Sequence, residues 1–292
     1  MKTVDPEAFA AAWSLRRERE FEFCPRGYFL RYYAARGGHE PETADRRTRS
    51  LYRLRGLIRR EAYLQRLVND AMREIFYAPE ELSPPPLFLA AVRRLREEFT
   101  AMLTGDTAVR GRLPMLGEFD DPALRPERLR RELEEQLNSR CADLERGDWP
   151  RVLAVPPSHR RYFKYPLELH VGEVLCHTPA VLAWQTHGVF NVVEGVARPP
   201  EGEAAELTAL LHRYHALGTP GADAGRVRSL GFDDRGRLVE FGTALEPGRA
   251  LKRLRDGFGK LRPPVGGVWS EAHFPPRLRN CRDCVFRSEC DA

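Results

Sequence analysis

The chain has 292 residues, of which 42% are hydrophobic and 30% are charged, and its formal net charge is +5. This composition allows one sizeable core or two small ones, and it excludes fibrous and intrinsically disordered classes. No apolar run approaches the roughly 18 residues that a membrane-spanning helix needs, and no N-terminal segment is typical of a secretory leader. We therefore expect a cytoplasmic protein with no membrane partner.

The first half of the chain predicts helices. Apolar residues recur at helical spacing in residues 6–35, where Pro25 follows Cys24 and suits the first turn of a new helix. A further amphipathic pattern over residues 50–76 predicts one long helix or two. The sequence SPPP at 83–86 interrupts it, and residues 87–104 and 125–146 are helical again. Residues 1–147 should thus be mainly helical.

Residues 148–262 predict a mixture of strands and helices. After a Pro-rich link at 148–157, residues 162–197 are rich in β-branched and aromatic side chains, and THG at 186–188 predicts a hairpin turn. A helix at about 203–217, a hairpin around DDRG at 233–236 and a basic helix at 247–261 follow. With a tail at 263–292, we expect a single α/β domain over residues 1–292.

Three cysteines lie close together in the tail, in NCRDCVFRSEC at 280–290. Cys281, Cys284 and Cys290 have the spacing C-x2-C-x5-C, which is one ligand short of a four-thiolate site. Clustered cysteines in a reducing compartment are more often metal or cluster ligands than disulfides. Cys141 and Cys176 fit ordinary single cysteines, whereas Cys24 stands in the distinctive segment FCPRGYFLRYY.

This combination resembles the iron–sulfur branch of the PD-(D/E)XK nuclease superfamily, which includes RecB-like nucleases, the AddB nuclease domain and CRISPR-associated exonucleases. The resemblance implies a restriction-endonuclease-like core, which is a mixed sheet flanked by helices, after an N-terminal helical region. It also implies a [4Fe–4S] cluster, held by Cys24, Cys281, Cys284 and Cys290, that joins the two ends of the chain. Zinc is the alternative occupant, since four cysteines also suit zinc.

The resemblance extends to the regions around the family's active site. YYAARGG at 32–38 and RTRSLYRLRGLI at 47–58 resemble the lead-in to the first active-site motif. VLCHTPAVLAWQTHGVFNVVEGVA at 174–197 resembles the hairpin that carries a metal-binding Asp and an acid-x-Lys motif. Active members use hard carboxylate oxygens to bind a divalent metal ion and a Lys to stabilise charge.

At these positions the chain departs from the family. Asn69 occupies the position of the family's His, and Ala180 occupies that of the Asp. Glu194 and Val196 occupy the positions of the acid and the Lys in the acid-x-Lys motif. In the following helix, Glu206 and Leu210 occupy the positions of the Gln and the Tyr. Only four of the 47 basic residues are lysine, and none follows an acidic residue by two positions. We expect an inactive site without Mg²⁺ or Mn²⁺. An active exonuclease would need relocated ligands, for which Glu173 or His177 are near enough in sequence.

Arginine and aromatic residues alternate in SHRRYFKYP at 158–166, and further arginines surround the cysteines. Arginine matches phosphate oxygens and aromatic rings stack on unpaired bases, so single-stranded DNA is a chemically reasonable partner. A solvated charged surface is the alternative. The candidate DNA contacts are Arg26, Arg160, Arg161, Lys164, Arg277, Arg279 and Arg282.

The function expected from these patterns is that of a catalytically inactive DNA-binding or scaffold subunit. It would act in recombination, repair or defence, beside a protein partner such as a helicase or an active nuclease. A metal-dependent exonuclease with relocated ligands, and a protein-interaction module that does not touch nucleic acid, are the alternatives.

Overall fold

The N-terminal helices form as predicted, with a break at Cys24. The computed structural model describes residues 12–40, 42–79, 85–104, 115–120, 123–195, 199–242, 246–261 and 270–290. Helix α1 (Leu15–Phe23) begins at Ser14, whose hydroxyl accepts the Arg17 N–H. Helix α2 (Pro25–Phe29) has Pro25 in its first turn, and a π-helical turn (Leu30–Ala34) continues it. Helix α3 (Arg46–Arg55) begins at Asp45.

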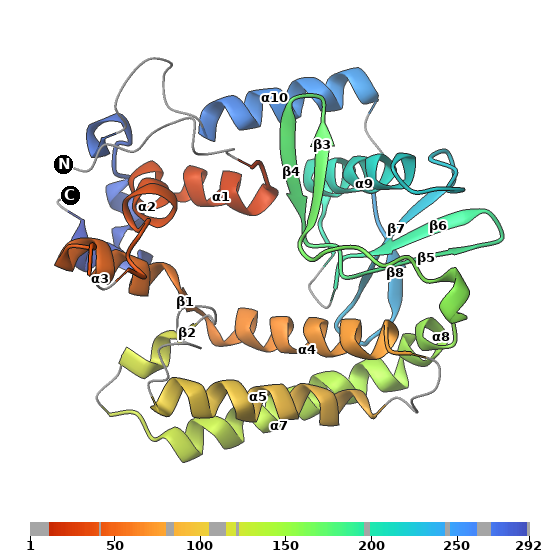
Figure 1. Ribbon diagram of the computed structural model, residues 1–292, viewed down its shortest axis with the longest axis horizontal. Coiled ribbons are helices and arrows are strands. Elements are labelled where there is room, and N and C mark those ends of the chain that lie inside the picture. Colours follow the sequence, from red (N-terminus) through yellow and green to blue (C-terminus); the bar gives the residue numbers. More distant parts are fainter. Residues whose placement is uncertain are drawn as a thin grey trace.

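The second amphipathic pattern is two helices rather than one. Helix α3 ends at Gly56, and strand β1 (Leu57–Ile58) pairs in parallel with β2 (Met115–Leu116) before α4 (Arg60–Phe76) begins. Helix α4 packs beside α5 (Leu87–Thr104) and α7 (Pro126–Arg146), as Figure 1 shows. The Pro-rich link contains a short helix, α8 (Trp149–Leu153), with Pro150 in its first turn.

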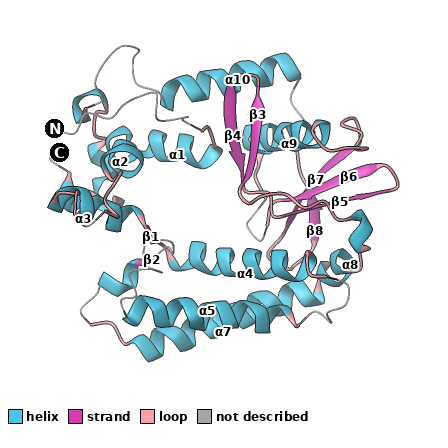
Figure 2. Cartoon of the chain, viewed as in Figure 1, coloured by secondary structure: helices cyan, strands magenta, loops and turns pink. Residues whose placement is uncertain are grey.

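A mixed sheet flanked by helices lies beside this bundle, as predicted (Figure 2). Its strand order is β5-β6-β7-β8, formed by Leu182–Thr186, Val189–Val193, Val227–Phe232 and Leu238–Glu240. Strands β6 and β7 are parallel, connected through α9 (Gly202–Leu217), and the other pairs are antiparallel. Both predicted hairpins are confirmed; in the first, His187 and Gly188 have positive φ.

A separate antiparallel hairpin precedes the sheet. It consists of β3 (Leu167–Val171) and β4 (Val174–Thr178), which turn at Gly172. Trp13 pairs with Cys176 of this hairpin, so the start of the described chain joins the second half of the fold. Helix α10 (Pro247–Leu261) packs against α1, β4 and α9.

One hydrophobic core joins the helical bundle to the sheet. It includes Leu67, Leu95, Leu133, Leu182, Val193 and Phe232. A second core joins α1, α2, α9 and α10 to the tail, and Phe274 and Phe286 of the tail are buried in it. The packing of these two cores fixes the helical half of the chain against the α/β half.

The tail consists of short 3₁₀ turns (Glu271–His273, Leu278–Asp283 and Arg287–Glu289) that lie against the N-terminal helices (Figure 1). Arg26 Nε donates to the carbonyl of Phe274 at 2.9 Å, and Arg47 donates to the carbonyl of Glu289 at 3.0 Å. The two ends of the chain are thus held together by direct contacts.

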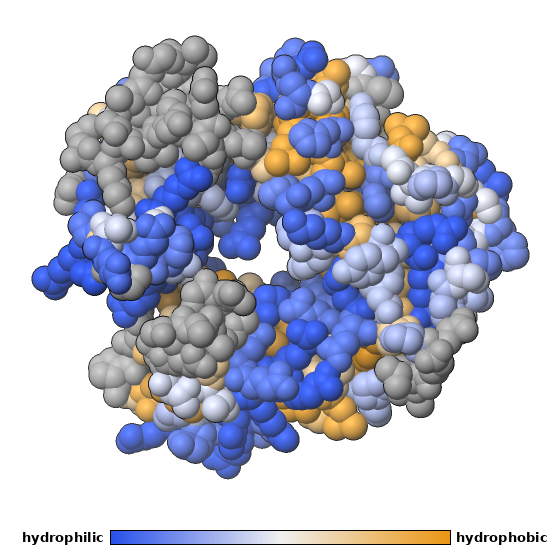
Figure 3. All heavy atoms as spheres, viewed as in Figure 1, coloured by the Kyte–Doolittle hydropathy of each residue, from blue (hydrophilic) through white to orange (hydrophobic). Residues whose placement is uncertain are grey.

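The molecule has an opening through its middle, visible in Figure 3, and the described side chains that surround it are mainly hydrophilic. Helix α1, the β3–β4 hairpin and α4 border it (Figure 1). None of the helices in the described parts of the chain combines the length and apolarity that a bilayer crossing needs.

Candidate functional site

Cys24 and Cys284 both lie beside Gly27, where the N-terminal helices meet the tail. Cys24 is buried just before α2, and the Gly27 N–H donates to its sulfur at 3.4 Å. A β-carbon built on Gly27 would lie 3.7 Å from the Cys284 sulfur and 3.8 Å from the Cys24 sulfur. Glycine at this position therefore leaves room beside both thiols.

The other two tail cysteines belong to the same neighbourhood. Burial raises the pKa of the Cys284 thiol, and the Cys24 and Cys281 thiols raise it further, against the opposing effects of the Phe286 N–H and Arg31. Burial also raises the pKa of the Cys290 thiol. Arg26 lowers this pKa, whereas the thiols of Cys24, Cys284 and Cys281 raise it further. The four predicted ligands are thus close enough to act on one another electrostatically.

The remaining two cysteines lie elsewhere. Cys141 is fully buried on α7 and Cys176 on β4, and burial raises the pKa of each thiol to about 12. Both behave as buried hydrophobic residues, as expected.

No group of three or more His, Cys, Asp or Glu side chains is arranged to hold a metal ion in the described ranges. The ligand set of Cys24, Cys281, Cys284 and Cys290 therefore stays a prediction.

Two positions of the predicted nuclease site meet where α4 faces the end of β6. The Asn69 amide lies so close to Gly195 that a β-carbon there would be 2.6 Å from both Asn69 Oδ1 and Nδ2. Gly195 follows Glu194, whose carboxylate accepts a hydrogen bond from Thr178 Oγ1 at 2.9 Å. Helix α4 thus contacts the chain just after β6.

Glu194 is held in a buried polar network. Its Oε1 lies 3.6 Å from His212 Nε2, and His212 Nδ1 lies 2.9 Å from Ser229 Oγ. The His212 side chain is fully buried, and that of Glu194 is only 10% exposed. Sequence patterns did not predict this network, because it joins β4, β6, α9 and β7, which are far apart in the chain.

The other positions of the predicted site contribute no further carboxylate to this network. Ala180 is fully buried, and Glu206 is half-buried on α9. Val196 lies outside the described residues. Of the relocated candidates, Glu173 lies 3.8 Å from Arg255, and His177 lies 3.6 Å from Glu168.

Charged and phenolic side chains from three segments approach one another near Tyr165. Burial raises the pKa of Tyr165, Asp70 raises it further, and Arg73 and Arg66 lower it. Tyr165 also acts on Arg16 of α1, whose side chain is 67% exposed. Glu194 also acts on Tyr165, so acidic, cationic and aromatic groups lie together in this part of the fold.

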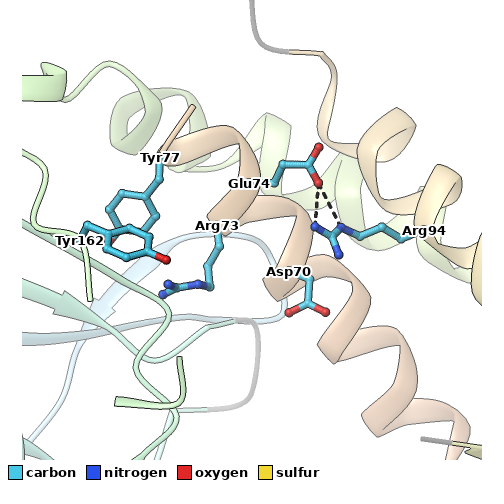
Figure 4. A pocket seen from close by; sticks show the side chains of 6 residues that line it. All are labelled: Asp70, Arg73, Glu74, Tyr77, Arg94 and Tyr162. Atoms are coloured by element: carbon cyan, nitrogen blue, oxygen red, sulfur yellow. Dashed lines mark hydrogen bonds and ion pairs between the residues drawn. The ribbon is translucent and has the colours of Figure 1, made fainter. Parts of the chain in front are cut away.

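A pocket of about 370 Å³ lies beside this region, between α4, α5 and the loop before β3 (Figure 4). Its lining residues are Asp70, Arg73, Glu74, Tyr77, Arg94 and Tyr162. Sequence analysis did not identify this pocket. The available signal was the i, i+3, i+4, i+7 spacing of Asp70, Arg73 and Glu74 of α4 and of Tyr77 just after it, which places them on one helix face.

The seven candidate DNA contacts differ in how their side chains are used. Arg160 donates to the carbonyls of Val155, Phe76 and Leu153, and Arg26 binds Phe274 as described above. Arg161 donates to the Ser158 carbonyl and to Gln185 Oε1. Lys164, Arg279 and Arg282 are exposed, and Arg277 is half-buried. Contact of any of them with DNA stays a prediction.

Comparisons of the chain with models of protein families, with curated proteins and with solved structures gave no significant match.

Proposed function

We propose that this protein is a catalytically inactive member of the PD-(D/E)XK class that carries an iron–sulfur cluster and binds DNA. It would act as a non-catalytic subunit beside a nuclease or helicase. The mixed sheet supports the class, because a hairpin (β5–β6), a helix (α9) and a strand parallel to the hairpin (β7) follow one another in the chain. The restriction-endonuclease-like core that the resemblance implies is likewise a mixed sheet flanked by helices.

One observation carries the proposal of inactivity. Where α4 meets the end of β6, an amide (Asn69) and a glycine (Gly195) stand beside the carboxylate of Glu194. That carboxylate is already bound by Thr178 and lies against His212. A divalent metal ion that activates water needs several free oxygen ligands, and the described groups at this point do not offer them.

The chemistry of the cysteine region supports an iron–sulfur cluster. Thiolates are the ligands that such clusters use, and backbone N–H groups pointing at the sulfurs stabilise the charged form. The Gly27 N–H bonds to Cys24, and the Phe286 N–H bonds to Cys284. Because a four-iron group stands between its thiolates, its ligands are farther apart than those of one zinc ion. The thiols of Cys24, Cys281, Cys284 and Cys290 lie near enough to act on one another electrostatically.

The central opening supports DNA binding. Arg16, whose side chain is 67% exposed, and Tyr165 lie close enough together to affect one another electrostatically. Guanidinium groups neutralise phosphates and phenol rings stack on bases, which suits a single strand. Exposed Lys164, Arg279 and Arg282 extend the basic surface.

The test is a cleavage assay and a mobility-shift assay on the same anaerobically purified protein. Labelled single- and double-stranded DNA are incubated with Mn²⁺, and binding is measured at several salt concentrations. We expect no cleavage and salt-dependent binding. Cleavage that a chelator stops and that Glu194→Gln abolishes would identify an active exonuclease instead. Absence of both cleavage and binding would favour a protein-interaction module.

A further inference from the structure

We propose that the pocket between α4 and α5 receives an unpaired guanine base; this inference rests on the proposed DNA-binding function and names the base that the protein selects. The pocket volume of about 370 Å³ lies within the roughly 300–1,000 Å³ of small-ligand sites. It combines an aromatic platform, a carboxylate and a guanidinium (Figure 4).

Tyr162 provides the platform. Its side chain is 76% exposed, yet its ring is fixed edge-to-face on Tyr77, with centroids 5.3 Å apart and an interplanar angle of 80°. Arg73 anchors the same loop, because it donates to the carbonyls of Phe163 at 2.8 Å and Val181 at 2.6 Å. An exposed ring on an anchored loop is suited to stacking on a base of a single strand.

Asp70 provides the acceptor. Arg66 Nη1 donates to one of its oxygens, Oδ2, at 3.0 Å. An ionised carboxylate has about four lone-pair sites, so acceptor capacity remains on the pocket side. Asp70 can therefore accept two further N–H groups that approach together.

Arg94 provides the donor. Its Nε and Nη2 both donate to Glu74 Oε2, at 3.1 and 2.8 Å, which fixes the plane of the guanidinium. Figure 4 shows the third nitrogen, Nη1, on the side that faces Asp70. A fixed donor next to a carboxylate presents one donor and two acceptors to a ligand.

This pattern matches one base. The Watson–Crick edge of guanine places two donors, N1–H and the N2 amino group, beside one acceptor, O6. Adenine and cytosine offer one amino group beside ring or carbonyl acceptors, and thymine offers a single N–H between two carbonyls. Only guanine offers two N–H donors to the Asp70 carboxylate and one carbonyl acceptor to Arg94. The other bases leave one acceptor position of the carboxylate without a hydrogen bond.

The test compares the four deoxynucleoside 5′-monophosphates in titrations monitored by NMR on the full-length protein. We expect dGMP to bind at least about tenfold more tightly than the other three, as one bidentate contact provides. Asp70→Asn should remove this preference and leave the weaker binding of the others unchanged. Tyr162→Ala should weaken all four. Asp256→Asn, at a carboxylate with a similar i, i+4 cationic partner on α10, is the matched control.

Equal binding of all four nucleotides by the unaltered protein would overturn the inference, and so would a dGMP preference that survives in Asp70→Asn. The wild-type comparison decides even if a variant fails to fold. An oligothymidine strand separates this failure from that of the proposed function. If the strand binds in a salt-dependent way while dGMP is not preferred, only the guanine site is wrong; if neither binds, the DNA-binding proposal fails.

Discussion

The side-chain amide of Asn69 fills the space that a side chain at position 195 would need. A β-carbon on Gly195 would lie 2.6 Å from both Asn69 Oδ1 and Nδ2, and Gly195 has a φ of +57°. Helix α4 and the end of β6 thus approach each other at a point where only glycine fits. This contact holds the helical half of the chain against the sheet.

Gly195→Ala should destabilise the protein for two separable reasons. A side chain at positive φ costs about 1–2 kcal/mol, and contact with Asn69 adds to this. The double variant with Asn69→Ala should recover the contact part and leave the backbone part. Urea unfolding of the four proteins in a double-mutant cycle measures the coupling. Purely additive effects would show that the two residues are not in contact.

The proposed cluster predicts that Cys284→Ser removes its visible absorbance and lowers the solubility of the protein, because the tail would then lose the group proposed to tie it to α2. Cys141→Ser is the matched control, since Cys141 is buried in the helical bundle away from the tail. Absorbance spectra and iron content of both variants, purified without oxygen, provide the readout. A Cys284→Ser protein with wild-type absorbance would show that the assigned ligand is wrong.

His215 should make the protein less stable in acid. Burial, and next the neighbouring His212, lower its pKa from 6.5 to about 4, and Phe163 and Phe190 lie edge-on to its ring. Between pH 6.5 and 4 the unfolded chain binds this proton more readily than the folded one, so stability falls as the pH drops through this window.

His215→Phe should therefore flatten the fall in stability between pH 6.5 and 4, measured by urea unfolding at several pH values. At pH 8 the histidine is neutral in both states, which makes that pH the reference for any packing effect of the substitution. An unchanged slope in the variant would show that another group is responsible for the acid sensitivity.

Arg160 and Lys164 should have different roles although both lie in one basic segment. Arg160→Met leaves three carbonyl groups without their donor, so it should lower the free energy of unfolding by at least about 2 kcal/mol. Lys164→Met should change stability by less than about 0.5 kcal/mol but reduce DNA affinity. The slope of the logarithm of the binding constant against the logarithm of the salt concentration should then become smaller by about one, because one phosphate contact is lost. A loss of stability in Lys164→Met together with unchanged stability in Arg160→Met would contradict these roles.

The elements with strong local signals could be predicted from the sequence. Pro25 marked the start of α2, and the turns at His187 and Asp233 marked the two hairpins of the sheet. The mixed α/β class followed from these elements. The break between α3 and α4 was less clear, because the apolar spacing continues through Gly56 and only the pairing of β1 with β2 fixes an extended segment there.

The candidate sites depended on tertiary packing that no local pattern contains. Arg160 resembled a phosphate contact by composition, but its acceptors include carbonyls at the ends of α4 and α8, which helices leave without partners. The pocket joins α4, α5 and the Tyr162 loop, and the Glu194 network joins four elements. Cys24 was matched to the tail through the resemblance, and the neighbourhood of the Cys24 and Cys284 sulfurs is consistent with it.

The most direct test of the account is the iron and acid-labile sulfide content of the protein purified without oxygen. A cluster held by Cys24, Cys281, Cys284 and Cys290 predicts about four irons and four sulfides per chain, and their loss in Cys24→Ser. About one zinc ion per chain without iron or sulfide, or no bound metal at all, would contradict the central claim that an iron–sulfur cluster joins the two ends of this fold.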